Sequence, residues 1–286
     1  MQKKIVTYKE WTPSVRNQRV PFDVDAEIFK GSGIIETADG EPIAAVVHLE
    51  DEARKKARLL GNLIHRGIPW NDASKTTKGS ARTSGIRYAN QTFGTTAPQP
   101  MRRRYGCRYA TFHDARPDIV ALLGDVFYAG WEHFQEILPE QAEETWKLTS
   151  QLVHEDWLFA DTPWTSGIIN DIVSLPYHRD SGNIPGTWSA MIVTRKDTDG
   201  SMLHLPEYGV ALECGDMSMM YFNGQAAWHG VTPMRVKNSA AYRRSIVMYS
   251  KSGCKECGPR ELEAARAAEV ATRHDVPHDS PLKKRT

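Results

Sequence analysis

IVSLPYHRDSGN, residues 172–183, contains a predicted β-strand followed by a turn. Where the strand ends, it carries two side chains, His178 and Asp180, of types that bind metals in many proteins. His178 and Asp180 are two residues apart, and on an extended chain such residues point to the same side. A turn that contains glycine and proline, SGNIPG (181–186), follows at once. One imidazole nitrogen and one carboxylate oxygen can therefore meet at a single metal ion where this strand ends.

A third ligand must come from elsewhere, and His229 in WHGV (228–231) follows another predicted strand and turn. Two histidines and one carboxylate cover one face of an octahedron and leave three positions open, as in non-haem Fe(II) oxygenases. A second His-x-Asp pair, His154 and Asp156, lies in a predicted helix. Helical residues two apart diverge by about 200°, so we expect this pair not to chelate a metal.

The strand AYRRSIVMYS (241–250) carries candidate groups for a co-substrate. Arg243 and Ser245 alternate onto one face, and Arg244 points to the other. A guanidinium binds a carboxylate through two parallel hydrogen bonds, and a serine hydroxyl can add a third. The distal carboxylate of 2-oxoglutarate requires such groups. The motifs together predict a dioxygenase that uses Fe(II), 2-oxoglutarate and O₂, with iron on the His-Asp-His triad and 2-oxoglutarate on Arg243 and Ser245.

The rest of the chain supplies a β-rich frame for these motifs. Short β-forming segments bounded by turns fill residues 165–252 and predict an antiparallel sandwich or barrel. An Asp-Gly turn predicts a hairpin over 31–49, and apolar periodicity predicts helices over 50–66, from Pro117, and from Pro139 to about His154. A final helix is expected from Pro259 to about Arg273. We expect one domain (1–286), mainly β with flanking helices (α+β), on a double-stranded β-helix (jelly-roll, cupin-like) core. Its parts are a mixed α/β region (1–160), the core (165–252) and an extension with CxxC and a helix (253–286).

HRDSGN, WHGV and RRSIVMYSK resemble motifs of the TET/JBP group of 2-oxoglutarate/Fe(II) dioxygenases, and the similarity covers roughly residues 165–252. These enzymes oxidise the 5-methyl group of a pyrimidine in DNA. The resemblance implies a 5-hydroxymethyl base, succinate and CO₂ as products, and DNA with a flipped base as partner. It favours 5-methylcytosine over thymine. It also implies that Asn183 hydrogen-bonds the base, that Tyr249 lines the base pocket, and that Lys251 occupies the place of a base-contacting histidine.

Residues 67–116 are rich in Gly, Ser, Thr, Pro and Arg and have little periodicity, so we expect an irregular segment on the substrate side. Arginines can neutralise phosphates, and aromatic rings can stack on an extruded base. The alternative is a solvated basic loop. The candidate residues for DNA are Arg102, Arg103 and Arg104, with Arg82, Arg87 and Arg108 and the rings of Tyr88, Phe93, Tyr105 and Tyr109 beside them.

The C-terminal extension holds a candidate zinc site. Cys254 and Cys257 form a CxxC pair, and His274 and His278 follow the predicted final helix. Two cysteines and two histidines are a zinc ligand set. The pair could instead take Cys107 or another partner, or remain two thiols.

Composition bounds the surroundings of the protein. The chain has 286 residues, a formal net charge of +1 and four cysteines, too few for a disulfide scaffold. No apolar run of about 18 residues suggests a membrane helix, and MQKKIVTYKEW lacks the apolar core of a signal peptide. We expect a soluble cytoplasmic protein (in the host cytoplasm if phage-encoded) in a reducing setting, with no membrane partner.

Two other functions compete with the reading as a DNA dioxygenase. The first is a 2-oxoglutarate-dependent hydroxylase of a small molecule, such as a free amino acid or nucleotide, for which the arginines of 82–108 would have no role. The second is a non-catalytic cupin-like module that binds DNA. The intact triad with Arg-x-Ser argues against the second. The oligomeric state is not predicted.

Overall fold

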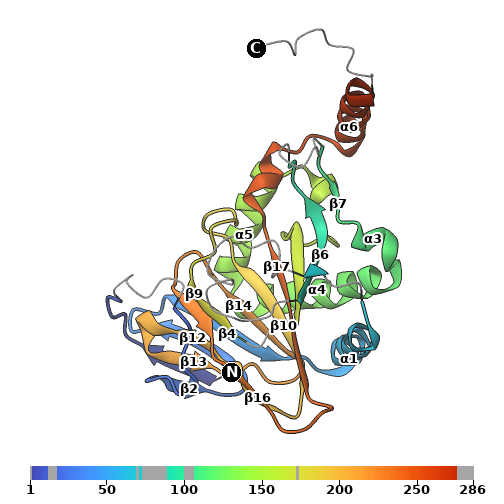
Figure 1. Cartoon of the computed structure of the whole chain (residues 1–286). Coiled ribbons are helices and arrows are strands. Elements are labelled where there is room, and N and C mark those ends of the chain that lie inside the picture. Colours follow the sequence, from blue (N-terminus) through green and yellow to red (C-terminus); the bar gives the residue numbers. More distant parts are fainter. Residues whose placement is uncertain are drawn as a thin grey trace, which may run out of the picture.

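The structure, a computed structural model, describes residues 2–11, 18–68, 71–72, 89–99, 106–171 and 174–275. Its centre is a sandwich of two β-sheets, and helices cover the outer face of the larger sheet (Figure 1). One apolar core lies between the helices and the larger sheet, and a second lies between the two sheets. Within the described ranges, no helix combines the length and apolar character needed to cross a membrane.

The larger sheet has ten strands in the order β1-β3-β4-β14-β10-β17-β8-β6-β5, and β7 pairs with β6. The predicted N-terminal hairpin is β3–β4, and its second strand pairs antiparallel with β14. The bounds are β1 (Gln2–Val6), β3 (Gly33–Thr37), β4 (Pro42–His48), β14 (Ser218–Phe222), β10 (Ser189–Lys196), β17 (Tyr242–Tyr249), β8 (Ser166–Asp171), β6 (Ala89–Thr96), β5 (Asn71–Asp72) and β7 (Arg108–Tyr109).

The smaller sheet has five strands in the order β2-β13-β12-β15-β9. Two opposed, largely antiparallel sheets with flanking helices confirm the expected double-stranded β-helix core. A two-stranded sheet, β11–β16, lies beside them. The bounds are β2 (Glu27–Phe29), β13 (Val210–Leu212), β12 (Leu203–Leu205), β15 (His229–Val231), β9 (Leu175–His178), β11 (Thr198–Gly200) and β16 (Met234–Val236).

The central strands of the larger sheet are apolar on both faces because each face is covered. On β14, Met219 and Tyr221 belong to the core under the helices, whereas Met220 and Phe222 belong to the core between the sheets. Alternate residues of a strand point to opposite faces. The segment MSMMYF is therefore a doubly buried strand rather than a half-exposed one.

Three helices lie where the sequence predicts them and cover this sheet: α1 (Asp51–Arg66), α4 (Pro117–Ile137) and α5 (Pro139–Leu152). Pro117 and Pro139 occupy first-turn positions, where proline is tolerated because its missing N–H would be unpaired anyway. The hydroxyl of Tyr221 donates to the carbonyl oxygen of Gly130 at 2.6 Å and ties the sheet to a helix. The helices are α1 (Asp51–Arg66), α3 (Phe112–Ala115), α4 (Pro117–Ile137), α5 (Pro139–Leu152) and α6 (Arg260–Asp275), with the 3₁₀ turns η4 (Glu155–Trp157), η5 (Pro206–Tyr208) and η6 (Ser252–Glu256).

The expectation of an irregular stretch over 67–116 is wrong for its described part. Strand β6 pairs antiparallel with β8 from Ala89 opposite Asp171 to Gly94 opposite Ser166. Phe93, expected among the base-stacking rings, is instead 1% exposed in the core under the helices. The segment ANQTFGTT has one large apolar residue, so its alternation is weak, and pairing with β8 decides its conformation.

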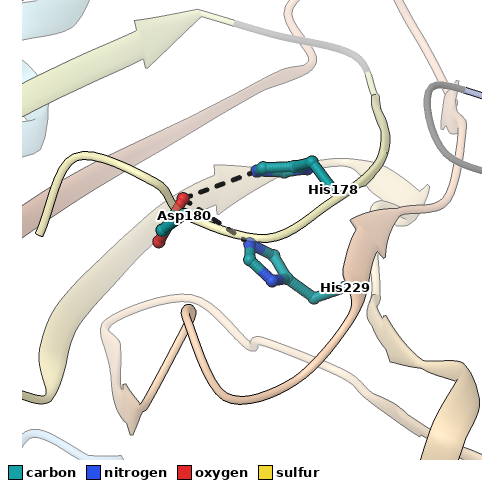
Figure 2. A group of neighbouring side chains, drawn as sticks. All are labelled: His178, Asp180 and His229. Atoms are coloured by element: carbon teal, nitrogen blue, oxygen red, sulfur yellow. Dashed lines mark ion pairs between the residues drawn. The ribbon is translucent and has the colours of Figure 1, made fainter. Parts of the chain in front are cut away.

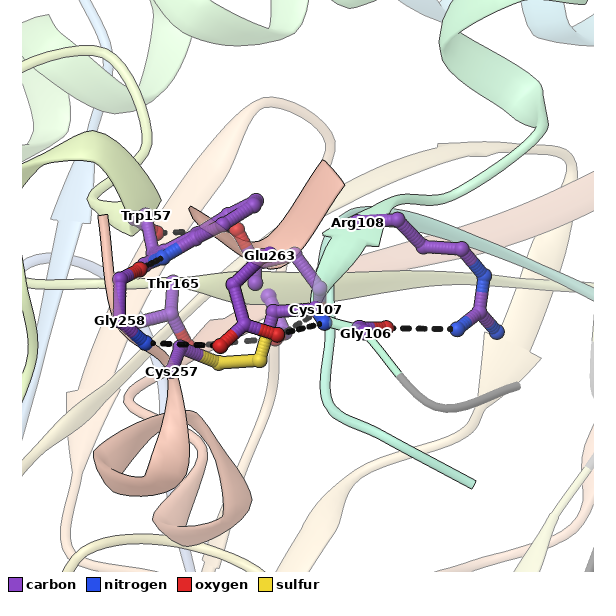
Figure 3. The surroundings of a disulfide bond; sticks show 10 residues. Gly106, Cys107, Arg108, Trp157, Thr165, Cys257, Gly258 and Glu263 are labelled. Carbon is purple, nitrogen blue, oxygen red and sulfur yellow. Dashed lines mark hydrogen bonds between the residues drawn. A yellow bond between two sulfur atoms is a disulfide. The ribbon is translucent and has the colours of Figure 1, made fainter. Parts of the chain in front are cut away.

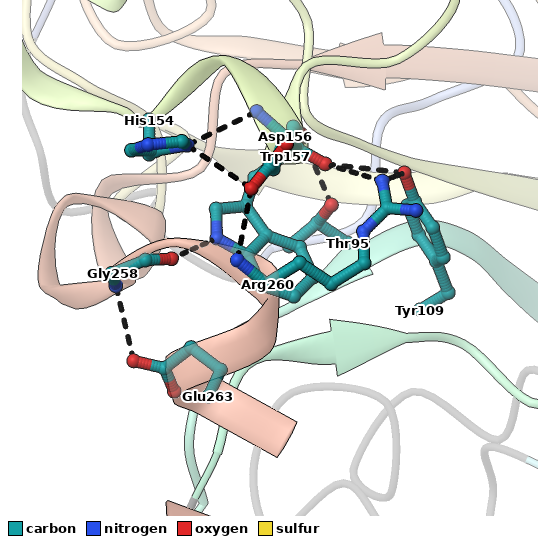
Figure 4. Close-up of polar contacts among 8 residues, drawn as sticks. All are labelled: Thr95, Tyr109, His154, Asp156, Trp157, Gly258, Arg260 and Glu263. Carbon is teal, nitrogen blue, oxygen red and sulfur yellow. Dashed lines mark hydrogen bonds and ion pairs between the residues drawn. The ribbon is translucent and has the colours of Figure 1, made fainter. Parts of the chain in front are cut away.

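The expected position of His154 and Asp156 within a helix is also wrong, although the pair still forms no metal site among the described residues. Helix α5 ends at Leu152, so His154 lies outside it. Its Nδ1 accepts a hydrogen bond from the N–H of Asp156 at 3.3 Å and lies 3.4 Å from Asp156 Oδ2 (Figure 4). Asp156 Oδ2 also accepts the backbone N–H of Arg260 at 2.9 Å. The pair attaches the C-terminal helix, and no third ligand joins it among the described residues.

The predicted zinc set is corrected by a disulfide between Cys257 and Cys107 (Figure 3). A cysteine binds a metal as its thiolate, so Cys257 cannot ligate zinc while it is part of a disulfide. Cys254 remains a buried thiol in the same apolar cluster. His274 lies in the last turn of α6, where only the backbone is described, and His278 lies outside the described residues.

We predict that alkylation of the denatured, unreduced protein labels two of its four cysteines, Cys214 and Cys254. Cys107→Ser should lower the free energy of unfolding by about 2–4 kcal/mol, because the bridge restricts the unfolded chain. Mass spectrometry of labelled peptides and denaturant unfolding measure the two effects. Four labelled cysteines would contradict the disulfide. If the native protein also retained zinc, the zinc site would be the better explanation of the cysteines.

Candidate metal centre

The structure brings the side chains of His178, Asp180 and His229 together (Figure 2). His178 ends β9 and His229 begins β15, and these residues lie opposite each other in the antiparallel pair. The Nε2 atoms of His178 and His229 lie 3.7 and 3.9 Å from Asp180 Oδ1. The ligand atoms of these three side chains all lie within 4.8 Å of one another. No other group of three or more histidine, cysteine or carboxylate side chains among the described residues is as close together.

Both imidazole rings are held so that the same nitrogen faces the centre of the group. Nδ1–H of His178 donates to the carbonyl oxygen of Pro176 at 2.8 Å, and Nδ1–H of His229 donates to that of Ala227 at 3.1 Å. A carbonyl oxygen can only accept, so Nδ1 carries the proton and Nε2 keeps its lone pair. Such hydrogen bonds orient metal-binding histidines in proteins.

Burial favours a neutral imidazole at His229. Burial, followed by the nearby His178, lowers the pKa of His229 to about 4. The His229 ring is therefore neutral at physiological pH, as metal binding requires. The carboxylate of Asp180 supplies the negative charge in the group, so the three residues match the chemistry of a divalent cation.

Gly224 leaves room for the Asp180 carboxylate. Its carbonyl oxygen accepts the N–H of Asp180 at 2.9 Å. A Cβ on Gly224 would lie 2.2 Å from Asp180 Oδ2 and 3.3 Å from His229 Cε1. This role of Gly224 has no signal in the sequence beyond a glycine between two strands, which by itself indicates a turn.

Arg243 and Arg244 lie on opposite faces of β17. Arg244 makes an ion pair with Asp171 at 3.4 Å, away from the cavity. Arg243 is 3% exposed, and its Nε has no hydrogen-bond partner among the described residues. Burial lowers the pKa of the Arg243 guanidinium to about 10, so it stays charged at neutral pH. Arg244 Nε and Nη1 also have no hydrogen-bond partner among the described residues, but Arg244 does not line the cavity. A buried N–H without an acceptor is costly, and an anionic ligand in the cavity would supply an acceptor for Nε of Arg243.

One cavity of about 470 Å³ joins these groups. His178, Asp180 and His229 line it, and so do Arg243 and Ser245. Asn183, Tyr249 and Lys251 also line it, and a bridge pairs the backbones of Asn183 and Lys251. Tyr249 and Lys251 continue into a second cavity of about 380 Å³ beside β6. A larger hollow of about 940 Å³ lies between α1 and α4, but it contains none of the predicted site residues.

Asn183 is buried and held in place. Its side-chain Nδ2 donates to the Ser189 hydroxyl at 3.2 Å, and its backbone carbonyl oxygen accepts a hydrogen bond from Nε2 of Gln225 at 2.6 Å. Burial, followed by the charge of Asp180, raises the pKa of Tyr249 to about 12, so the phenol stays protonated. The candidate DNA-binding residues Arg102, Arg103 and Arg104 lie outside the described residues.

No protein-family model matches the chain, and no curated protein matches its sequence. Among solved structures, NgTET1 in complex with 5mC DNA is similar with a TM-score of 0.57 at 11% identity, over 93% of this chain and 90% of that chain. An oxidoreductase of the 2OG-Fe(II) oxygenase family from Burkholderia pseudomallei gives 0.45 at 13%, over 75% and 88%. OsALKBH1 gives 0.39 at 12%, over 72% and 97%. The similarity to NgTET1 confirms the expected TET-like oxygenase fold.

We predict that Gly224→Ala weakens binding of a divalent metal by about 10-fold or more, because the new Cβ displaces the Asp180 carboxylate. Gly182→Ala is the matched control, since Gly182 lines the same cavity and a Cβ there meets nothing within 4 Å. Calorimetric titration with Co(II) measures both affinities. Equal affinities in the two variants would mean that Gly224 does not position Asp180.

We predict that Arg243→Met lowers the affinity for 2-oxoglutarate by about 100-fold, the loss of roughly 3 kcal/mol of charged hydrogen bonding. Without 2-oxoglutarate, the variant should unfold at the same temperature as the wild type or higher, because a buried uncompensated charge is removed. Arg244→Met should keep the affinity. Thermal unfolding with and without 2-oxoglutarate gives both quantities, and a destabilised variant that still binds 2-oxoglutarate would contradict the assignment.

Proposed function

We propose that the chain is an Fe(II)- and 2-oxoglutarate-dependent dioxygenase that hydroxylates the 5-methyl group of a pyrimidine in DNA, with 5-methylcytosine preferred over thymine. The observation that carries this proposal is the cavity that joins the His-Asp-His group to the partnerless buried Nε of Arg243. An open divalent-metal site and a buried cation are the two features that binding of an α-keto diacid requires.

His178, Asp180 and His229 would hold the iron, and Arg243 with Ser245 would bind the distal carboxylate of 2-oxoglutarate. Iron and 2-oxoglutarate, when bound, supply the O₂-dependent hydroxylation of a C–H bond, with succinate and CO₂ as co-products. The protein orients the reactants and excludes water. Apolar wall residues such as Met191, Val247 and Phe222 suit the second task.

Asn183, Tyr249 and Lys251 would bind the base. They lie on the cavity wall and offer an amide, a protonated phenol and an ammonium group to the polar edge of a pyrimidine. Their support is the shared cavity and the resemblance of HRDSGN and RRSIVMYSK to TET/JBP motifs. NgTET1, whose fold is similar, was solved with 5mC DNA, which favours DNA over a small metabolite as substrate.

We predict that the protein with Fe(II), 2-oxoglutarate and O₂ converts 5-methylcytosine in duplex DNA to 5-hydroxymethylcytosine. Matched duplexes with 5-methylcytosine or with unmodified cytosine, where thymine is the available methylpyrimidine, are digested to nucleosides for mass spectrometry. Succinate is measured in parallel. His178→Ala is the control and should form neither product, because a metal ligand is missing.

Each outcome separates the candidate functions. 5-Hydroxymethyluracil formed from both duplexes would assign thymine as the substrate. Unchanged DNA, with succinate formed from 2-oxoglutarate when a free amino acid or nucleotide is supplied and hydroxylated, would identify a small-molecule hydroxylase. No succinate with any substrate, in protein that binds DNA, would favour the non-catalytic module.

A further inference from the structure

A buried carboxylate joins the two chain segments that carry the metal-binding residues. Glu207 lies in η5, and its side chain is 3% exposed. Its Oε1 accepts a hydrogen bond from Nη2 of Arg179 at 2.7 Å. Its Oε2 accepts the backbone N–H of Trp228, also at 2.7 Å. Arg179 lies between His178 and Asp180, and Trp228 directly precedes His229.

The segment that contains Arg179 and the segment that contains Trp228 also contact each other directly. The Arg179 guanidinium lies 5.5 Å from the ring centre of Trp228. The carbonyl oxygen of Glu207 accepts the N–H of Lys9, which anchors the turn itself to the N-terminal segment. Glu207 is thus held from the backbone side and binds one partner with each carboxylate oxygen. Such an arrangement permits little freedom in the position of either partner.

Strand pairing alone leaves the spacing between the metal-binding residues poorly determined. The β9–β15 pair contains a register shift between His229 and Val231, at the position where His178 faces His229. A bulge disrupts the ladder of hydrogen bonds locally. The segment that carries Asp180 lies beyond the end of β9. A further connection between the two segments is needed at this point, and the Glu207 carboxylate provides one.

Glu207 contacts none of the three metal-binding side chains and does not line the cavity. Its effect on the site has to pass through Arg179 and Trp228. Taking a carboxylate out of water is costly unless it is paired and hydrogen-bonded. Both requirements are met here by residues adjacent to metal-binding residues.

We propose that Glu207 is a positioning residue of the metal centre. It sets the separation between the HRD segment and the HGV segment, and thereby the affinity for a divalent metal. The inference rests on the metal site described above. It does not depend on the identity of the organic substrate.

Glu207→Gln and Arg179→Met test this proposal with Co(II) as the probe. Glutamine keeps the size of the side chain but presents an NH₂ group to one of two donors, so one hydrogen bond is lost. We expect each variant to bind Co(II) about 10- to 100-fold more weakly. The double variant should bind Co(II) no more weakly than whichever single variant binds it less tightly, because the two substitutions remove the same connection. The visible absorption of bound Co(II) should change with the affinity.

Glu36→Gln is the matched control. Glu36 is also a buried carboxylate, 8% exposed, and pairs with Lys3 at 3.1 Å, but it lies on β3 and does not line the cavity. Its neutralisation should lower the melting temperature without changing the affinity for Co(II) or the Co(II) spectrum. A purely structural role for Glu207 predicts the same behaviour in Glu207→Gln.

The outcomes are distinguishable. Wild-type protein that binds no Co(II) would remove the metal site and this inference with it. Wild-type binding with equal binding by Glu207→Gln and Arg179→Met would overturn this inference alone. If Glu207→Gln does not fold, Arg179→Met decides, because it leaves the bond between Glu207 and Trp228 in place. A loss of affinity equal to that of Glu36→Gln would show general destabilisation and overturn the positioning role.

Discussion

The antiparallel pairing of β9 with β15 is the constraint on which the site depends. It places His178 opposite His229 at the end of the smaller sheet. Asp180 lies two residues beyond the end of β9, and its N–H donates to the carbonyl oxygen of Gly224, which helps to hold its carboxylate near both histidines. Because side chains alternate with a period of two, a slip of one residue in this pair would turn one histidine away from the other. The surrounding sandwich, with a filled core between its sheets, keeps both strands in this register.

Two buried charges next to the metal-binding residues differ in an informative way. Glu207 has a partner for each carboxylate oxygen, so its charge is compensated within the protein. Arg243 lies equally deep, yet its Nε has no partner among the described residues. The first arrangement holds the chain in place, and the second suits an anion that arrives from solution. Groups that bind a ligand often lower the stability of the empty protein in this way.

Local patterns predicted the elements whose signals are strong. The amphipathic helices α1 and α4, the β3–β4 hairpin and the strand β17 all lie near their expected positions. Strand β6 was missed, because its sequence has little apolar alternation and its partner β8 is distant in the chain. The pairing of Cys257 with Cys107 was missed as a disulfide for a similar reason. It joins residues separated by 150 positions, which no local pattern can relate.

The sequence by itself determined which residues have the chemistry to bind a metal and a carboxylate, and which of two adjacent arginines shares a face of β17 with Ser245 and so lines the cavity. These properties follow from side-chain chemistry and from the two-residue period of a strand, and both are local. Tertiary structure decided how far His229 lies from Asp180, that Gly224 leaves space for the carboxylate, and that Glu207 connects the two segments. Distances between residues far apart in sequence depend on strand pairing and on the packing of two sheets, and the order of residues along a chain does not encode them locally.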